Sequence, residues 1–366
     1  MKIECIKDKL TSVVSKTEKI TTKNSTLPIL SCLFLEAKNN NLIIRATNLD
    51  LGLEISFPVK VEKEGVVAVS GMILNSFLSN ISGDKNISLE VVENNLYIKT
   101  KNNKTVIKTL NNEDFPIIPT VSKEKTIKIN PKEFAKGLKS VWYSGAFSSV
   151  KPELSSVYIY EDGESIVFAA TDSFRLAEKK VSIKKMKEFN HFLIPLKNIP
   201  EIIKVLEEAE GDMDLDFDKH QIAFSYNGVY LTSRIIDGVF PDYKQIIPKE
   251  VKTSVIVLKQ DFINSLKVAN VFSDKFNKVN LKVDPKIKTF EIKTKNSDFG
   301  ENINKLDAVV KGDGVDINLN FKYISDCFQS INSDSVAISF NGPSKAIIVN
   351  GVSDKTFTYL VMPMNN

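Results

Sequence analysis

The chain contains an internal repeat with a period close to 125 residues, and this repeat limits its possible folds more than any other feature. A stretch of thirteen residues begins at Val69, again at Ile194 and again at Leu319, so each copy starts 125 residues after the previous one. Apolar residues recur without a gap at four positions spaced i, i+3, i+4 and i+7, which predicts the buried face of an amphipathic helix. These positions hold Leu74, Ile199 and Ile324, then Phe77, Ile202 and Cys327, then Leu78, Ile203 and Phe328, and finally Ile81, Leu206 and Ile331.

A second helix is predicted in front of each of these helices. In every copy a short alternating strand leads through a polar turn into a helix whose apolar residues lie four positions apart. The strands carry Ile3 and Cys5, Ile127 and Ile129, and Val255 and Val257, and the helices carry Leu10 and Val14, Phe134 and Leu138, and Phe262 and Leu266.

Strand and turn signals fill the rest of each copy. Segments with strand signals align at Asn48, Asp172 and Asn296, each 124 residues from the next. A Phe-Pro pair recurs at residues 115–116 and 240–241, which predicts the ends of the first two copies. We therefore predict an α+β protein of three tandem domains, each with two helices packed on antiparallel sheets. The expected domains are residues 1–120, 121–248 and 249–366.

The composition is that of an ordinary globular protein, with 42% apolar and 26% charged residues in a chain of 366. The sequence has no apolar run of the roughly 18 residues that a membrane span needs. Its first residues lack the apolar core of a signal peptide, so we expect an intracellular protein. Cys5, Cys32 and Cys327 are far apart in apolar surroundings, which favours reduced core residues.

No familiar catalytic motif is present in the sequence. The two histidines, His191 and His220, lie outside any ligand-like cluster, and the P-loop, G-x-S-x-G and H-E-x-x-H patterns are missing. We therefore expect no metal, no cofactor and no enzymatic activity, but a binding or scaffold role. The remaining alternative is a carboxylate-dependent hydrolase built on aspartates that share one strand face, although a solvated face is the simpler interpretation. These aspartates are Asp212, Asp214, Asp216 and Asp218.

Four short motifs connect the chain with a known family. They are TLPIL at residues 26–30, TDSFRLA at residues 171–177, FPDY at residues 240–243 and YLVMPM at residues 359–364. Together with the threefold repeat, they resemble the bacterial sliding clamp, the beta subunit of DNA polymerase III, over the whole chain and in the same order. The resemblance implies a head-to-tail homodimer that closes into a ring around duplex DNA, with helices lining the hole. It implies a non-catalytic processivity factor, and the alternative is a DNA-binding scaffold of similar fold that does not close into a ring.

The resemblance also implies a set of partners. These are double-stranded DNA of any sequence, a second copy of the chain, the alpha subunit of DNA polymerase III, the clamp-loader ATPase, and other replication and repair proteins with a clamp-binding motif. No membrane partner is expected, and the expected location is the bacterial cytoplasm, at the nucleoid.

The family further implies a pocket for a partner peptide that carries a glutamine and one or two large apolar residues. Leucine, isoleucine and methionine walls suit such adaptable binding. Arg175 can donate to peptide carbonyls or pack its stem along the groove. The matching positions are Leu154, Thr171, Ser173, Phe174, Arg175, Leu176, Pro241, Ile246, Leu360, Met362, Pro363 and Met364.

A sliding protein needs a positive lining that holds phosphates without reading bases. The net charge of +4 is too balanced to indicate nucleic-acid binding by itself, so this lining requires segregation of charge. The resemblance implies DNA contacts at Lys23, Asn24, Lys132, Lys136, Lys139, Lys151, Lys197 and Lys204, with Lys9, Lys16 and Lys267 as further candidates. It implies dimer contacts at Thr105, Ile107, Val271 and Phe272, for which core packing is the simpler interpretation.

The sequence departs from the family pattern in three places. Asn24 stands where an arginine is common, and Gln245 stands where a basic residue is frequent. The chain ends in Asn365 and Asn366 where the family often has Arg-Leu. The last two changes remove positive charge at the rim of the pocket, and they leave the preference among partner motifs open.

Overall fold

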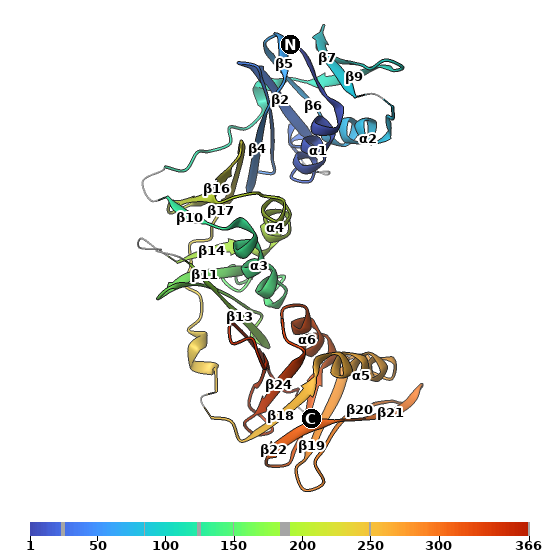
Figure 1. Cartoon of the computed structure of the whole chain (residues 1–366), viewed down its shortest axis with the longest axis vertical. Helices are drawn as coiled ribbons and strands as arrows, with labels where there is room; N and C mark the ends of the chain where they lie inside the picture. The colour runs from blue at the N-terminus through green and yellow to red at the C-terminus, as the bar shows by residue number, and fades with distance from the viewer. Residues whose placement is uncertain are drawn as a thin grey trace. The chain divides into compact units, whose positions relative to one another are not determined.

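The computed structural model describes residues 1–22, 26–83, 85–122, 126–148, 150–183, 191–248 and 250–364. It divides into two compact units (Figure 1), which are Met1–Lys132 with Lys197–Ile235, and Glu133–Leu196 with Ile236–Asn366. Each unit combines one outer repeat with part of the middle repeat. The division therefore falls inside the middle repeat and not between repeats.

The first unit is built on one antiparallel sheet with thirteen strands in the described residues. Their order is β10-β15-β16-β17-β4-β3-β2-β6-β9-β8-β7-β1-β5. Strand β4 of the first repeat pairs with β17 of the second, with Leu53 opposite Leu231, so the sheet continues from one repeat into the next. The strands are β1 (Lys2–Ile6), β2 (Cys32–Lys38), β3 (Asn41–Thr47), β4 (Leu51–Pro58), β5 (Lys60–Lys63), β6 (Gly65–Ser70), β7 (Asn86–Val92), β8 (Asn95–Lys99), β9 (Lys104–Leu110), β10 (Ile127–Ile129), β15 (Met213–Phe217), β16 (Gln221–Tyr226) and β17 (Val229–Arg234).

The α-helices of the first unit bury the apolar faces that the repeat predicts. Leu10, Leu74 and Ile202, one from each helix, are fully buried. Each such side chain contributes about 1.5–3 kcal/mol by leaving water, and burial of this face stabilises short helices more than intrinsic propensity does. No helix in the described part of the chain is long and apolar enough to pass through a lipid bilayer. The helices of this unit are α1 (Lys7–Glu18), α2 (Gly71–Asn80) and α4 (Ile199–Glu207).

The second unit has two antiparallel sheets in the described residues, ordered β14-β11-β12-β13-β26-β25-β24-β18-β22 and β21-β20-β19-β23. Strand β13 of the middle repeat pairs with β26 of the last repeat, with Leu176 opposite Leu360. This junction has the same form as the β4–β17 junction. The strands are β11 (Ser156–Asp162), β12 (Ser165–Thr171), β13 (Arg175–Ser182), β14 (Phe192–Pro195), β18 (Thr253–Leu258), β19 (Lys278–Asp284), β20 (Thr289–Asn296), β21 (Gly300–Leu306), β22 (Ala308–Gly312), β23 (Val315–Asn320), β24 (Ser335–Phe340), β25 (Ile347–Gly351) and β26 (Phe357–Val361).

The last predicted helix is shorter than its two counterparts. Its α-helical part is α6 (Phe321–Asp326), and a 3₁₀ turn, η7 (Cys327–Gln329), follows it. The predicted apolar stripe is still buried, since Ile324 and Cys327 are fully enclosed and Ile331 is 2% exposed. A tighter final turn is common at helix ends and preserves the buried face. The other helices assigned mainly to the second unit are α3 (Pro131–Val141) and α5 (Lys259–Val271).

The alternating aspartates do not form one solvated face, so that interpretation was wrong. Asp216 is only 2% exposed because Thr126, next to β10, covers it and donates a hydrogen bond to its carboxylate at 2.6 Å. Asp218 accepts the backbone N–H groups of His220 and Gln221 and thereby closes the turn into β16. Among the described residues, no group of three or more His, Cys, Asp and Glu side chains is placed to hold a metal ion.

The cysteines are core residues, as predicted. Cys5, Cys32 and Cys327 are free and buried. Burial and the nearby Glu4 raise the pKa of the Cys5 thiol to about 12, so it stays protonated near neutral pH.

Gly137 allows α3 to lie close to the sheet of the second unit. A methyl group on its Cα would overlap the ring of Phe168 in β12, which is fully buried. Phe134 of α3 meets the same ring edge-on, with the ring centroids 5.1 Å apart. The glycine is less favourable for a helix than alanine, but it permits this close contact of helix and strand.

Replacement of Gly137 with alanine should lower the free energy of unfolding by about 1–3 kcal/mol, because overpacking against Phe168 outweighs the better helix propensity of alanine. Urea denaturation followed by circular dichroism measures the change. Lys136→Ala, on the exposed face of the same helix, is the control and should stay within about 0.5 kcal/mol of the wild type. A G137A variant as stable as the wild type would contradict the close packing.

Candidate functional site

Residues 171–175, which we call the Thr171 turn, form a network of hydrogen bonds between β12 and β13. The hydroxyl of Thr171 donates to the Arg175 carbonyl at 2.7 Å and accepts the Ser173 N–H at 3.1 Å. One carboxylate oxygen of Asp172 accepts the N–H groups of Phe174 and Arg175 at 2.9 and 3.0 Å. This network holds Ser173 at a φ of 78° and leaves Phe174 60% exposed. The turn therefore presents an aromatic ring to solvent on a fixed backbone.

The Arg175 side chain supports the turn from inside the protein. Its Nε donates to the Asp172 carboxylate at 2.9 Å, and one terminal nitrogen donates to Asp326 at 2.5 Å. The other terminal nitrogen donates to the Tyr143 carbonyl at 2.6 Å, and the guanidinium lies 4.6 Å from the ring centroid of Tyr323. With only 10% of the side chain exposed, these donors face inward. Arg175 therefore supports the turn, and its contact with a partner peptide stays a prediction.

The floor beside the Thr171 turn is apolar. Leu176 and Leu360 face each other across the β13–β26 pair and are 1% and 2% exposed. The Met362 N–H donates to the Phe174 carbonyl at 2.8 Å, which ties the end of β26 to the Thr171 turn. Leu176 and Leu360 thus belong to a buried cluster and not to an open surface. The other buried members of this cluster are Ala169, Leu193, Phe240, Tyr243, Ala346 and Ile348.

A hollow of about 680 Å³ opens next to this cluster. Two predicted pocket residues line it, Ile246 and Met362, which are 55% and 39% exposed. We call it the Ile246–Met362 hollow. Sequence reasoning missed most of its wall, because those residues come from loops that carry no periodic signal. The other lining residues are Gln245, Pro248, Glu250, Lys252, Asn341, Ser344, Lys345 and Ala346.

Several predicted pocket residues are not among the described lining of this hollow. Leu154 is 7% exposed and packs inside the second unit, whereas Pro241 is exposed. Pro363 and Met364 are half-buried, and the Met364 N–H donates to the Asn318 carbonyl at 2.8 Å. The structure therefore gathers only part of the predicted set around one cavity.

Strand β9, where dimer contacts were predicted, has an open backbone edge. It pairs with β8 over residues 104–108, but with β6 only at Thr109 and Leu110. Val106 and Leu110 are 49% and 44% exposed, and Thr105 is half-buried. Ile107 is 4% exposed, so its side chain is core, as the simpler interpretation held.

The other predicted contact lies at the end of α5. Val271 is 68% exposed, while Phe272 is half-buried and closes the helix. Strand β21 lies against α5 and pairs only with β20 in the described residues, so its outer edge is open. Phe276 and Ile303 are 59% and 53% exposed in the same region of the fold.

Lysines gather on one face of α3. Lys132, Lys136 and Lys139 are exposed and lie opposite the buried Phe134. Lys136 is 3.9 Å from the Glu133 carboxylate, and both side chains are more than half exposed, so this pair contributes little. The spacing predicted from the sequence thus produces a basic helix face.

Two other candidate lysines have acidic partners. Lys197 contacts Asp50 at 2.6 Å, and Lys204 contacts Glu201 at 2.7 Å. Lys151 is exposed. The positive charge of Lys197 and Lys204 is thus partly offset by the protein itself.

Of the further lysine candidates, two are exposed and one contacts a carboxylate. Lys9 and Lys267 are exposed, whereas Lys16 contacts Glu208 at 2.5 Å. Lys23, Asn24, Asn365 and Asn366 lie outside the described residues.

The fold defines a class of protein: a tandem array of three modules, each with two helices on antiparallel sheets, in which strand pairing joins successive modules. Three models of one family match the chain. The N-terminal, central and C-terminal domains of the DNA polymerase III beta subunit match residues 1–119, 128–242 and 244–365. The chain belongs to the DNA polymerase III beta subunit family.

Individual relatives agree with this assignment. The beta sliding clamp of Synechococcus elongatus is 24% identical and covers 100% of this chain and 99% of its own length. That of Staphylococcus aureus is 24% identical, with 98% of this chain and 97% of its own length covered. Among solved structures, the sliding clamp of Bacillus subtilis has a TM-score of 0.95 at 22% identity, covering 100% of this chain and 99% of its own. The beta subunit of Pseudomonas aeruginosa has a TM-score of 0.94 at 20% identity and full coverage of both chains.

These findings confirm the expected three-module α+β fold and the expected function. The protein is a DNA polymerase processivity factor and has no catalytic role of its own. The hydrolase and the scaffold without a ring are not favoured. The domain ends at residues 120 and 248 stay predictions.

Substitution of Arg175 with methionine should lower the free energy of unfolding by roughly 3 kcal/mol, since it leaves two carboxylates without their buried partner. Urea denaturation measures the loss. Lys180→Met is the matched control on β13, because its ion pair with Asp162 is 43% and 42% exposed and should contribute less than about 1 kcal/mol. Equal losses for R175M and K180M would contradict the supporting role.

Proposed function

We propose that this protein binds a peptide of its partners in the Ile246–Met362 hollow. The observation that carries the proposal is the hollow itself, which opens beside a hydrogen-bonded turn and above an apolar cluster. Isoleucine and methionine walls adapt to several partner side chains. The expected ligand carries a glutamine and one or two large apolar residues. The expected partners are the alpha subunit of DNA polymerase III, the clamp-loader ATPase and other replication and repair proteins.

The internal repeat supports a head-to-tail dimer. Strand β4 pairs with β17 and β13 pairs with β26, each time between the strand after an aligned turn and the last strand of the next repeat. Strand β21 follows the third aligned turn, at Asn296, and β9 is the last strand of the first repeat. By the same rule, β21 of one copy pairs with β9 of another. A heterologous contact of this kind covers both open edges and closes into a ring.

We expect this ring to encircle double-stranded DNA in the bacterial cytoplasm, at the nucleoid. The lysine face of α3 supports contact with phosphates, and contacts that read no base permit sliding. Retention on DNA raises the local concentration of the attached polymerase without altering its chemistry. The sequence holds no P-loop, so opening of the ring falls to the separate loader ATPase.

Replacement of Ile246 with aspartate should weaken binding of a glutamine-leucine-phenylalanine peptide at least tenfold, because it removes an exposed apolar contact and sets a charge against the apolar side chains of the peptide. Fluorescence anisotropy with the labelled peptide measures the affinity. Ile287→Asp is the matched control, since Ile287 is 65% exposed in the β19–β20 turn. Unchanged peptide affinity in I246D would refute the pocket.

Replacement of Val271 with glutamate should raise the dimer dissociation constant at least tenfold, because the interface would bury an unpaired charge. Sedimentation velocity at several protein concentrations measures the dimer fraction. Val309→Glu, at a position 57% exposed on β22, is the control and should leave the dimer intact. A V271E protein that dimerises like the wild type would contradict this interface.

A further inference from the structure

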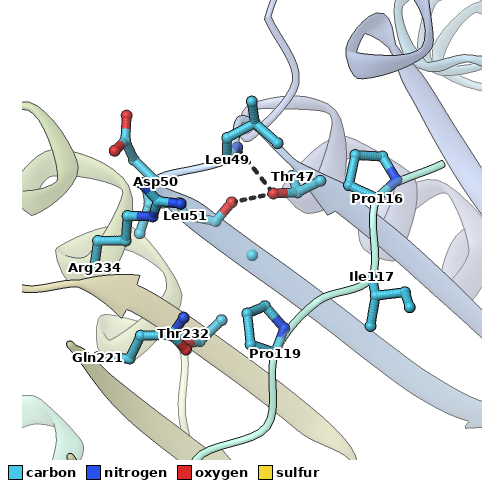
Figure 2. Close-up of a pocket in the computed structure, with 11 residues that line it drawn as sticks. Thr47, Leu49, Asp50, Leu51, Pro116, Ile117, Pro119, Gln221, Thr232 and Arg234 are labelled. Atoms are coloured by element: carbon cyan, nitrogen blue, oxygen red, sulfur yellow. Dashed lines mark hydrogen bonds between the residues drawn. The ribbon is translucent and has the colours of Figure 1, made fainter. Parts of the chain in front are cut away.

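The first unit contains a cavity of about 100 Å³ that lies apart from the Ile246–Met362 hollow. Figure 2 shows that its walls come from the turn between β3 and β4, from residues 116–119, and from β16 and β17. Pro116, Ile117 and Pro119 form one apolar side, and Leu49 and Leu51 lie across from them. Its size suits one leucine or isoleucine side chain.

The turn that borders this cavity repeats the bonding of the Thr171 turn. The Thr47 hydroxyl donates to the Leu51 carbonyl at 2.8 Å and accepts the Leu49 N–H at 3.0 Å. The Asn48 side-chain oxygen accepts the N–H groups of Asp50 and Leu51 at 3.0 and 2.7 Å. Leu49 has a φ of 75°, close to the 78° of Ser173. We call residues 47–51 the Thr47 turn.

The strand pairs next to the two turns also correspond, β4–β17 to β13–β26. Gly52 pairs with Thr232 as Leu176 pairs with Leu360. The Arg234 N–H donates to the Asp50 carbonyl at 2.8 Å, which reproduces the 2.8 Å bond from the Met362 N–H to the Phe174 carbonyl. Arg234 therefore occupies the backbone position of Met362, and Thr232 that of Leu360. The two junctions share one backbone frame, and through it Arg234 of the cavity corresponds to Met362 of the Ile246–Met362 hollow.

The side chains of this second site differ in a way that selects a charged ligand. Arg234 is exposed, lines the cavity and forms no ion pair with any described residue. The acidic lining residue, Asp50, forms an ion pair with Lys197 at 2.6 Å instead. A guanidinium that replaces the methionine of the other site favours a carboxylate next to an apolar group.

We propose that this cavity, the Arg234 cavity, is a second docking site for a short peptide of a partner protein. The peptide inserts one leucine or isoleucine side chain between Leu49 and Ile117 and presents a neighbouring aspartate or glutamate to Arg234. Leu49 and Ile117 are 46% and 92% exposed, so they are available at the rim. The inference rests on the proposed function, because it extends peptide docking to a second copy of the same backbone frame.

The test uses the full-length protein with labelled isoleucine and leucine methyl groups, observed by NMR. The probe is acetyl-Leu-Asp-amide, compared with acetyl-Leu-Asn-amide, which has the same shape without the charge. We expect the aspartate probe to shift the methyl signals of Ile117 and Leu49 and to bind about two- to fivefold more tightly than the asparagine probe, as for an exposed charge pair. Arg234→Gln should abolish this preference, and the control Lys63→Gln, an exposed cation on β5 outside the cavity, should keep it.

Two outcomes would overturn the inference: no shift at Ile117 and Leu49 with either probe, or an equal preference for the aspartate probe in R234Q. The methyl signal of Ile246 reports separately on the proposed pocket when the glutamine-leucine-phenylalanine peptide is added. R234Q should leave that response unchanged. If Ile117 responds to the aspartate probe but Ile246 does not respond to the longer peptide, this inference is supported and only the proposed pocket is contradicted.

Discussion

Antiparallel pairing between strands of successive repeats is the interaction on which the rest of the structure depends. Strands β4 and β17, and likewise β13 and β26, are joined by backbone hydrogen bonds that require no particular side chain. Both pairs have the same register. The turn before β4 therefore lies next to the end of β17, and the turn before β13 lies next to the end of β26. The Arg234 cavity is lined by such a turn and strand end, and Met362, at the matching strand end of the other junction, lines the Ile246–Met362 hollow.

The turns at these junctions keep their shape while their surroundings change. A threonine hydroxyl and the side-chain oxygen of Asn48 or Asp172 satisfy the same backbone groups in both copies. The residues that follow are then free to differ, and Arg175 anchors the second turn where Leu51 lies in the first. The same backbone position thus holds an apolar side chain, Met362, at one junction and a basic side chain, Arg234, at the other.

Apolar periodicity was sufficient to predict the helices and most strands, because each element has one face that must leave water. It did not show which side of a strand the rest of the chain covers, and so it failed for Asp216. The partners of Arg175 could not be inferred either. Tyr143 and Asp326 are 32 and 151 residues away, and only the folded chain brings them together. Ile246 and Met362 were predicted from the family resemblance, whereas their neighbours at Asn341 and Ser344 lie in a loop without a pattern.

The common rule of strand pairing has a mechanical consequence for the proposed assembly. Junctions within a chain are held both by paired strands and by the covalent backbone that runs on through them. The junction of β21 with β9 of another copy has strand pairing and side-chain contacts alone. In the proposed ring this junction can therefore open without the unfolding of any segment, and exposed apolar residues such as Val271 and Ile303 are the side chains available to stabilise it.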